Sequence, residues 1–525
     1  MNKIHVLDTT LRDGGYCNDW TFGYTRIKKI AEGLNHAGIE IVECGFLTEK
    51  IVYERDKSKF SNLDEAAQVI QKKYSNTLYV CMINYGEFSI EHLPEHNEDY
   101  IDGIRVAFHK KDRVAAMEFC KAIKQKGYKV FIQPMVSLSY TDKEFLELIE
   151  LTNTIQPYAF YIVDSFGTMR GKELIRLFGN VEKNLDENIW IGYHAHNNLQ
   201  LAYSNAKLLA ENVTNRSLII DTSIFGMGRG AGNLNTELFV EYLNETRETN
   251  YKSIYLLRII DEILMQFYNR NYWGFSIPYY ISAINECHPN YASFLDGRKT
   301  LTVENMEYIM ERIDEDKKSV FDEKYIQKLY MEFMTRDKVN VENDRIFEEL
   351  VADKNILLVA PGKSILDEEN KIRDCVEKNN PIIISINFSY DAFQTDFIFI
   401  SNIRRFEELD ARYLTKVIST SNIQSDDIYM KLNYESHIIN DDFVKDNAGL
   451  MLIHYLIGKK VKKIFLAGFD GFSMDIDQNY IDDEMAQVNN KNILVQTNNG
   501  LKKMLGQYAQ IIPMEFVTEP RFIKI

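Results

Sequence analysis

Eight short apolar runs, separated by amphipathic segments, restrict the fold of this chain more than any other feature. The runs lie near residues 3–8, 39–44, 78–83, 101–107, 128–135, 158–164, 189–195 and 218–225. Between them apolar residues recur at helical spacing, as in residues 25–36 and 171–184. A strand followed by a helix, repeated eight times, predicts a TIM (β/α)₈ barrel over residues 1–245.

The rest of the chain has a different pattern. Residues 246–345 are helical in pattern and rich in tyrosine, methionine and charge, which predicts a helical extension and connector. From about residue 346 apolar runs alternate with helical segments again, which predicts a Rossmann-like α/β domain over 346–525. These later runs are residues 356–360, 382–387, 397–401, 416–420 and 463–468.

The charge and the cysteines exclude several classes of protein. The net charge of −16 argues against non-specific binding to nucleic acid. No apolar run is long enough to cross a membrane, and the start of the chain does not have the shape of a signal peptide. The six cysteines show no metal-binding spacing, so a reducing cytoplasm is expected.

Two motifs at the ends of predicted strands indicate a metal site. Arg12 and Asp13 follow the first run, and His194 and His196 end the seventh. Residues two apart on a strand point to one face, so the two imidazoles can converge. Two imidazoles and a carboxylate suit a divalent metal, and the neighbouring Arg12 can stabilise an anion bound to it.

The position of these residues agrees with the predicted barrel. Asp13, Glu43 and the two histidines fall at strand C-terminal ends, as does the glycine-rich segment 226–233. A TIM barrel carries its chemistry on that face. Alone, a His-x-His or an Arg-Asp pair is weak evidence; together at strand ends they are specific.

These motifs resemble those of the DRE-TIM metallolyases, which include 4-hydroxy-2-oxovalerate aldolases, 3-hydroxy-3-methylglutaryl-CoA lyases and 2-isopropylmalate synthases. Further matching pieces are residues 41–46, 104–107, 163–167 and 226–233. The resemblance implies Asp13, His194 and His196 as metal ligands, with Asn233 as a fourth. It also implies that Glu43 holds metal-bound waters or a ligand, and that the metal is Mn²⁺, with Mg²⁺, Co²⁺ or Zn²⁺ as alternatives.

One position departs from the aldolase pattern. The aldolases have a histidine three residues after the metal aspartate, and this chain has Tyr16. A phenol with an ordinary pKa of about 10 is a poor base at neutral pH. Tyr16, a bound water and His109, at the end of the fourth strand, therefore remain open as the proton-transfer group; a purely structural role for His109 is as plausible.

The expected reaction is that of a class II, metal-dependent aldolase. A pyruvate-type 2-oxo acid would form an enolate stabilised by Arg12, and an aldehyde would add to it or leave. The first alternative is a Claisen-type acyl-CoA lyase or condensing enzyme; the glycine-rich loop lacks the cysteine that the lyases carry there. The second alternative is an inactive scaffold. A homo-oligomer is expected.

The C-terminal domain contains a second candidate site. Gly362, Lys363 and Ser364 follow its first strand, and Asp470 follows a late one. A strand–glycine–helix turn can hold a phosphate, although a structural turn capped by Ser364 explains the residues equally well. The order of these pieces is similar to bacterial sialyltransferase-like domains, which implies a sugar-nucleotide partner and an aldehyde derived from a sugar, for a surface polysaccharide.

Overall fold

The computed structural model describes residues 3–70, 72–97, 101–212, 215–298, 300–390, 392, 394–482, 485 and 491–523. The chain forms two compact units. Residues 1–293 with 313–321 form the barrel unit, and residues 294–312 with 322–525 form the C-terminal unit. The boundaries at 245 and 345 drawn from the sequence stay a prediction.

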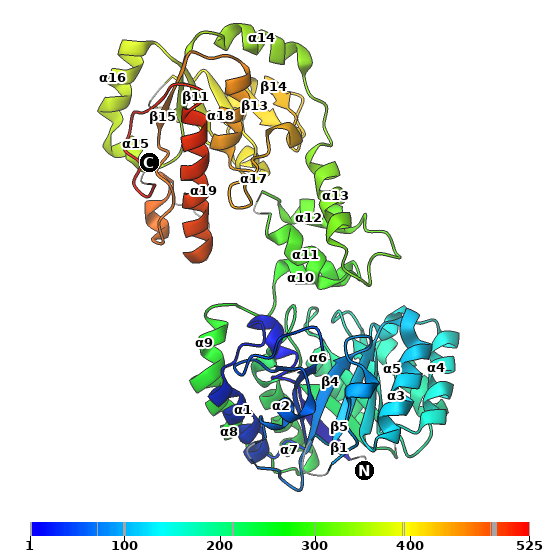
Figure 1. Ribbon diagram of the computed structural model, residues 1–525. Coiled ribbons are helices and arrows are strands. Elements are labelled where there is room, and N and C mark those ends of the chain that lie inside the picture. Colours follow the sequence, from blue (N-terminus) through cyan, green and yellow to red (C-terminus); the bar gives the residue numbers. More distant parts are fainter. Residues whose placement is uncertain are drawn as a thin grey trace. The chain divides into compact units, whose positions relative to one another are not determined.

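The barrel unit contains the predicted closed ring of eight parallel strands (Figure 1). Pairing of β1 with both β9 and β2 closes the ring. A further short strand, β3, extends the sheet beside β2. The ring strands are β1 (Ile4–Asp8), β2 (Ile41–Leu47), β4 (Leu78–Asn84), β5 (Gly103–Phe108), β6 (Lys129–Pro134), β7 (Ala159–Asp164), β8 (Trp190–Ala195) and β9 (Leu218–Thr222); β3 is Lys59–Phe60.

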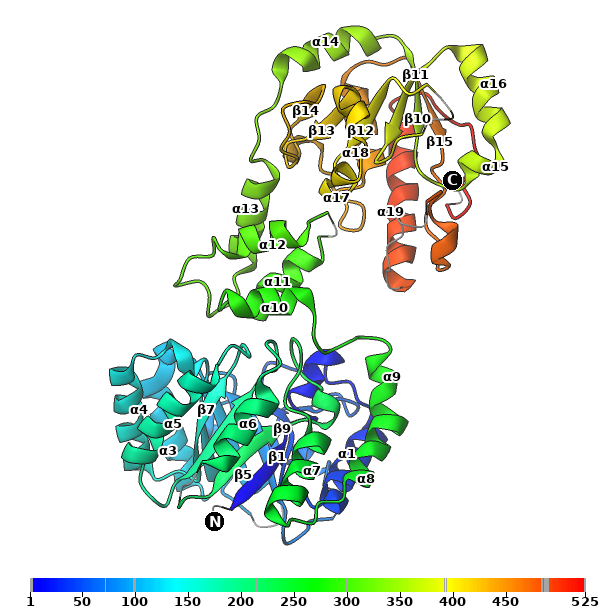
Figure 2. The ribbon, with the colours of Figure 1, turned by 180° about the vertical axis from the view of Figure 1, so that it is seen from behind.

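Helices surround this ring, as both views of the ribbon show (Figure 2). Helix α4 illustrates why they form. Thr141 and Glu144 make a reciprocal capping box at its start, and Phe145, Leu148 and Ile149 line its buried face. The helices are α1 (Tyr24–Ala37), α2 (Leu63–Ala67), α3 (Arg113–Gln125), α4 (Asp142–Ile155), α5 (Gly171–Asn184), α6 (Ala202–Glu211) and α7 (Thr236–Arg247).

The segment after the barrel is helical, as predicted. A π-helical turn, Ile260–Leu264, interrupts its first long helix. The other helices are α8 (Ser253–Ile259), α9 (Met265–Tyr268), α10 (Ile277–Ile284), α11 (Pro289–Asp296), α12 (Val303–Met310), α13 (Glu323–Met334) and α14 (Val341–Val351).

The C-terminal unit contains the predicted parallel sheet, with strand order β14-β13-β12-β11-β10-β15-β16. The order reverses between β10 and β15. The strands are β10 (Asn355–Val359), β11 (Ile382–Ile386), β12 (Phe397–Ile400), β13 (Val417–Thr420), β14 (Met430–Leu432), β15 (Lys463–Ala467) and β16 (Met514–Phe516). The helices are α15 (Ser364–Asp367), α16 (Glu369–Asn379), α17 (Ile403–Glu407), α18 (Ala448–Gly458) and α19 (Lys491–Ala509).

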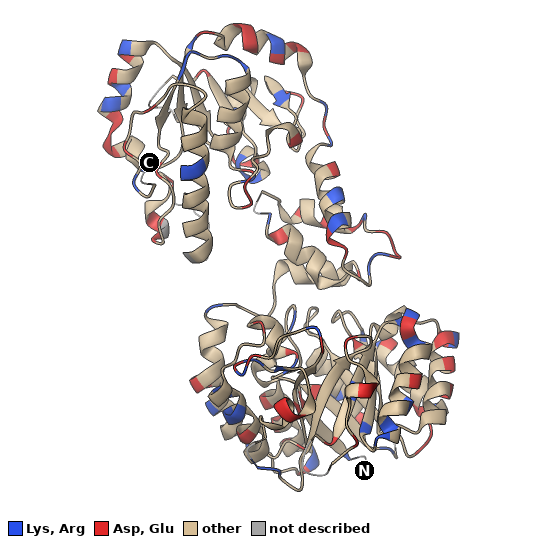
Figure 3. Ribbon diagram, viewed as in Figure 1, with Lys and Arg blue, Asp and Glu red and all other residues tan. Residues whose placement is uncertain are grey.

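Positions of basic and acidic residues are interspersed along the outer helices, for example on α3, α4 and α5 (Figure 3). Within the described ranges, no helix combines the length and the apolar character needed to cross a bilayer.

Candidate active site

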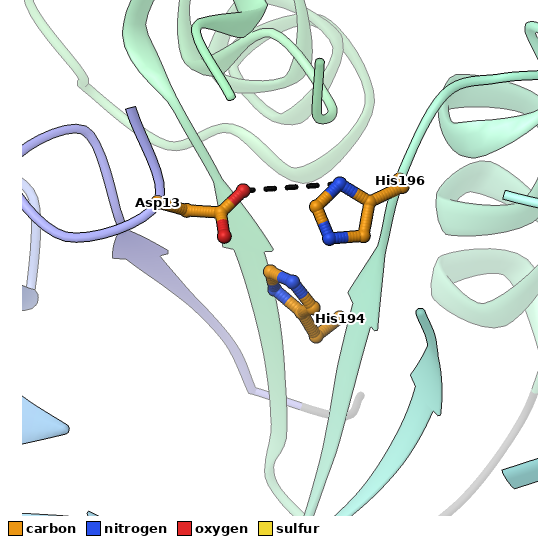
Figure 4. Close-up of side chains that lie close together, drawn as sticks. All are labelled: Asp13, His194 and His196. Atoms are coloured by element: carbon orange, nitrogen blue, oxygen red, sulfur yellow. Dashed lines mark ion pairs between the residues drawn. The ribbon is translucent and has the colours of Figure 1, made fainter. Parts of the chain in front are cut away.

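The barrel brings Asp13, His194 and His196 together (Figure 4). Asp13 lies in the turn after β1, His194 is on β8, and His196 follows that strand. One ligand atom from each residue lies within 4.8 Å of the others. The three side chains are buried, so they can hold a cation away from bulk water.

Both imidazoles can present a ring nitrogen to a metal. His194 Nδ1 lies 2.9 Å from Asp221 Oδ2, which leaves Nε2 as the nitrogen that can bind a metal. Burial lowers the pKa of His196 to about 3; its Nδ1 makes no hydrogen bond among the described residues and lies 3.8 Å from Asp13 Oδ2 (Figure 4). A neutral ring with a free lone pair is what a metal requires.

Asn233 lies against the carboxylate of this group. Its Nδ2 donates to Asp13 Oδ2 over 2.6 Å, while its buried Oδ1 has no partner within the described part of the chain. A Cβ at Gly228 would stand 2.2 Å from Asn233 Nδ2, so only glycine fits beside this pair. A carboxylate and two imidazoles fit a divalent metal. The role of Asn233 as a fourth ligand stays a prediction.

Arg12 is held beside this group by carboxylates. Its Nη1 donates to Asp13 Oδ1 over 2.6 Å and its Nε to Glu43 Oε2 over 2.8 Å. Burial alone would raise the pKa of Asp13, but Arg12 and the two histidines hold it well below its ordinary value. Asp13 is therefore an anion, and the guanidinium is oriented next to the cation position.

Glu43 connects Arg12 to a second arginine inside the barrel. Its Oε1 lies 2.9 Å from Arg105 Nη1, and Arg105 also pairs with Asp221. Arg105 is fully buried. The contacts of Glu43 that the structure shows are thus with arginines, and its predicted role toward metal-bound waters stays a prediction.

Tyr16 lines the same cavity as Arg12, Asp13 and His196. Loss of hydration raises the pKa of Tyr16 although the residue is 42% exposed, and the neighbouring Arg229 offsets this only in part. A neutral phenol donates a hydrogen bond, and it is an even poorer base than its ordinary pKa suggests.

His109 does not line this cavity, although it lies at the end of β5 as predicted. Burial lowers the pKa of His109 most, and the positive charge of Lys111 lowers it further. His109 is outside the group of Asp13, His194 and His196, but it lies near Arg229 and His288, whose charges and its own act on one another. Its role in proton transfer stays a prediction.

Four site residues were not identified from the sequence: Arg105, Asp221, Arg229 and His288. The first two could have been noticed, because each is a charged residue inside an otherwise apolar strand. Arg229 stands in the glycine-rich loop and lines the cavity. His288 does not line the cavity, but its Nε2 lies 3.5 Å from Arg229 Nη1. It comes from the turn between α10 and α11, far along the chain, and no local pattern marks it.

In the C-terminal unit, Gly362, Ser364 and Asp470 lie together. The backbone N–H of Ser364 donates to Asp470 Oδ2 over 2.8 Å, and the Ser364 hydroxyl donates to Thr518. A Cβ at Gly362 would stand 2.3 Å from the Gly468 carbonyl oxygen, so the turn requires glycine. The Asp470 carboxylate thus accepts the hydrogen bond from the Ser364 N–H that a phosphate was expected to accept. Phosphate binding near Lys363 stays a prediction.

A cavity adjoins this turn at the C-terminal ends of β10, β11 and β15. Ligands of open α/β sheets bind where the strand order reverses, and this cavity lies at such a point. Asn387 Oδ1 and Asp470 Oδ1 are buried there without a partner among the residues that the structure describes. The cavity therefore offers two hydrogen-bond acceptors to a ligand.

Comparison with known proteins concerns the barrel. The HMGL-like family model matches residues 107–262. The 4-hydroxy-2-oxovalerate aldolase of Pelotomaculum thermopropionicum is 28% identical over 247 residues, which are 46% of this chain and 70% of that protein. The enzyme of the same name from Pseudoalteromonas translucida is 24% identical over 272 residues, 50% of this chain and 76% of its own.

A solved structure, the N-terminal domain of an aldolase candidate from Bacteroides vulgatus, covers 58% of this chain and 98% of its own, with 25% identity and a TM-score of 0.47. The family model and the aldolase relatives support the DRE-TIM metallolyase superfamily that the motifs of the barrel indicate. They also support a lyase of the aldolase kind.

Proposed function

We propose that this chain, with its barrel of the DRE-TIM metallolyase kind, is a metal-dependent aldolase that joins a pyruvate-type 2-oxo acid to an aldehyde, or splits the product. One observation carries the proposal. Asp13, His194 and His196 converge at the barrel mouth with the Arg12 guanidinium hydrogen-bonded to Asp13. A metal position beside a fixed cation is what enolate formation needs.

The residues have separate tasks. Asp13, His194, His196 and the Asn233 amide oxygen would hold the cation, here Mn²⁺, with Mg²⁺, Co²⁺ or Zn²⁺ as alternatives. A divalent cation supplies Lewis acidity that makes the methyl protons of the 2-oxo acid acidic. Arg12 stabilises the negative charge that develops on the substrate oxygen. Tyr16 donates a hydrogen bond, and a water molecule carries the proton.

The test uses the half-reaction that does not depend on the aldehyde. Pyruvate is incubated in D₂O with the full chain, with Mn²⁺ and with chelator, and loss of the methyl proton signal is followed by NMR. Exchange that requires Mn²⁺ is expected. No exchange with pyruvate or another 2-oxo acid, together with condensation of acetyl-CoA, would favour the Claisen alternative.

One observation bears on the Claisen alternative, which would need a reactive cysteine near the glycine-rich loop. Cys17 approaches the glycine-rich loop, and its thiol donates to the Gly228 carbonyl oxygen over 3.2 Å. Burial raises the pKa of Cys17 to about 12. A buried thiol with such a pKa is inert, so the structure favours the aldolase. The scaffold alternative is tested by the metal content of the purified protein.

The C-terminal unit is proposed to bind a sugar nucleotide in the cavity at the reversal of strand order. The acceptor atoms of Asn387 and Asp470 support a ligand with hydroxyl or amine donors. An aldehyde derived from a sugar, for a surface polysaccharide, suits such a domain. Calorimetry with CMP and with UDP-sugars tests this. A cytoplasmic location and a homo-oligomer belong to the same proposal.

A further inference from the structure

Arg229 is a cation in the barrel cavity that the proposed metal chemistry does not use. It lies in the loop between Ile224–Gly226 and α7, and its side chain lines the cavity together with Arg12, Tyr16 and Ser165. Its guanidinium faces the Tyr16 ring at 5.6 Å. Two arginines therefore lie in one cavity, and only Arg12 is hydrogen-bonded to the carboxylate of the metal group.

The two arginines differ in their partners. Arg12 pairs with Asp13 and Glu43, whereas Arg229 has no carboxylate within ion-pair distance among the described residues. The Nη2 of Arg229 donates to the Ser165 carbonyl oxygen over 3.0 Å, and its Nε is buried without a partner there. A buried cationic donor without an acceptor is costly unless a ligand supplies one.

His288 presents a second donor at the same place. Its Nδ1 accepts the backbone N–H of Asn290 over 3.1 Å, so the proton of the neutral ring is on Nε2. That Nε2 lies 3.5 Å from Arg229 Nη1. Two donors cannot satisfy each other, but both can donate to one oxygen anion placed beside them.

The other charges of the site balance one another and leave the positive charge of Arg229 uncompensated. Arg12 and Arg105 face Asp13, Glu43 and Asp221, which gives this buried group one negative charge. A divalent cation and a 2-oxo acid monoanion together bring it to neutrality. The charge of Arg229 then remains for a different anionic group.

We propose that Arg229 and His288 form a second anion subsite at the mouth of the barrel, which binds a carboxylate or phosphate group carried by the aldehyde. The inference rests on the proposed aldolase reaction and specifies its substrate class. The planar guanidinium can bind two oxygens of such a group, and the His288 N–H binds one. Neutral aldehydes then lack the contact that places their carbonyl group near the enolate.

The first test compares matched aldehydes in the Mn²⁺-loaded full chain with pyruvate. The pairs are glyceraldehyde with glyceraldehyde 3-phosphate, and butanal with succinic semialdehyde. We expect kcat/KM to be at least about tenfold higher for a charged member, the effect of one charged hydrogen bond. The two pairs distinguish a phosphate from a carboxylate. Equal values within both pairs would overturn the proposal.

Variants then locate the effect. Arg229→Gln should reduce the ratio of charged to neutral kcat/KM by about tenfold or more, and Arg229→Lys should retain part of it. Arg258→Gln removes the same charge from an exposed position, where the side chain is 65% accessible, and serves as the control. If Arg229→Gln lowers the values for both members alike, Arg229 is structural and the proposal is wrong.

Calorimetry provides a test that does not depend on turnover. Glycerol 3-phosphate and butyrate are titrated into the Mn²⁺-loaded protein with pyruvate present. At least one should bind, and its affinity for Arg229→Gln should be about tenfold lower. If neither binds the wild-type protein, the subsite does not exist. Pyruvate exchange in D₂O, measured on the same wild-type sample, shows separately whether the aldolase assignment fails.

Discussion

At the residue scale, the candidate site is organised by charges that touch one another inside the barrel. Arg12 contacts Glu43, Glu43 contacts Arg105, and Arg105 contacts Asp221, which holds His194. The arginine expected to stabilise the enolate and the histidine expected to bind metal are thus joined by ion pairs.

Arg12→Lys should reduce turnover far more than stability. Lysine keeps a positive charge between Asp13 and Glu43, but it cannot donate to both from one rigid plane. The loss of transition-state stabilisation should be about 2–4 kcal/mol, the effect of a lost oxyanion donor. Pyruvate exchange rates and thermal unfolding measure the two effects. A variant with near-normal exchange would contradict the role of Arg12.

Asp221→Asn should weaken metal binding without removing a ligand. The amide cannot replace the carboxylate that orients the His194 ring, so affinity for Mn²⁺ should fall by about 10–100-fold. His194→Ala should abolish binding, and the exposed Asp142→Asn is the control. Titration of the three variants with Mn²⁺ gives the order of their metal affinities. Wild-type affinity in Asp221→Asn would show that His194 does not need this partner.

His5 should make the barrel unit less stable in mild acid. Burial and Lys3 lower its pKa from 6.5 to about 4, so between these values the unfolded chain binds a proton that the folded chain does not. The stability from the neutral ring is complete above pH 6.5 and decreases as pH falls, by up to about 1.4 kcal/mol per pH unit. His5→Gln should remove the contribution of His5 to this slope, while His196, His288 and His109, whose pKa values burial also lowers, keep theirs.

Urea unfolding from pH 4.5 to 7.5, followed by tryptophan fluorescence, measures how the stability of the barrel unit changes with pH. Trp20, Trp190 and Trp273, the three tryptophans of the chain, all lie in the barrel unit. Asp8 and Asp164, whose pKa values burial raises to about 6 and about 7, produce the opposite slope in both proteins. The difference between wild type and variant therefore isolates His5. Parallel curves would show that His5 does not titrate on unfolding.

At the scale of the element, the alternation of strands and helices predicted the barrel and the second sheet, and the structure confirms both. Short elements escaped prediction: β3, β14 and β16 are too brief to show a pattern. Helix α2 is also short and ends at Ala67. Asp13, His194 and His196 were found because they stand at strand ends; Arg105 and Asp221 were missed because they lie inside strands.

Gly362→Ala tests the turn after β10. The new methyl group would meet the Gly468 carbonyl oxygen at 2.3 Å and the Asp470 carboxylate at 2.7 Å, both held by their neighbours. The C-terminal unit should lose roughly 1–3 kcal/mol, the usual cost of overpacking. Circular dichroism should show an earlier transition that tryptophan fluorescence does not follow, because that unit has no tryptophan.

Gly506→Ala is the matched control for this substitution. Gly506 lies inside α19, and a Cβ there would meet nothing within 4 Å. Alanine is the better helix former by about 1 kcal/mol, so this variant should be unchanged or more stable. If both variants melt alike, the close approach at Gly362 is relieved by a shift of the loop.

At the scale of the whole molecule, the helical segment is divided between the two units, and this predicts how the chain can be cut. Within the C-terminal unit, Tyr330 approaches Tyr434 at 3.3 Å, and Arg404 Nε donates to the Leu301 carbonyl oxygen over 2.9 Å. A fragment of residues 294–525 keeps these contacts, and one of residues 346–525 loses them.

We therefore expect the longer fragment to unfold at higher urea concentration and with greater cooperativity. Circular dichroism of the two fragments and of the full chain gives the comparison. Equal stability of both fragments would place the independent domain at residue 346, as the sequence alone suggested, and would show that helices α12 and α13 only connect.

The buried ion-pair network has a consequence for how such an enzyme can diversify. The groups that would handle the 2-oxo acid are fixed to several strands at once, so a change in one of them disturbs the others. Tyr16, Arg229 and His288 lie in turns outside that network. Mutation of these three residues can therefore change which aldehyde binds, while the residues for enolate formation stay the same. Relatives that share the network should be able to act on different aldehydes.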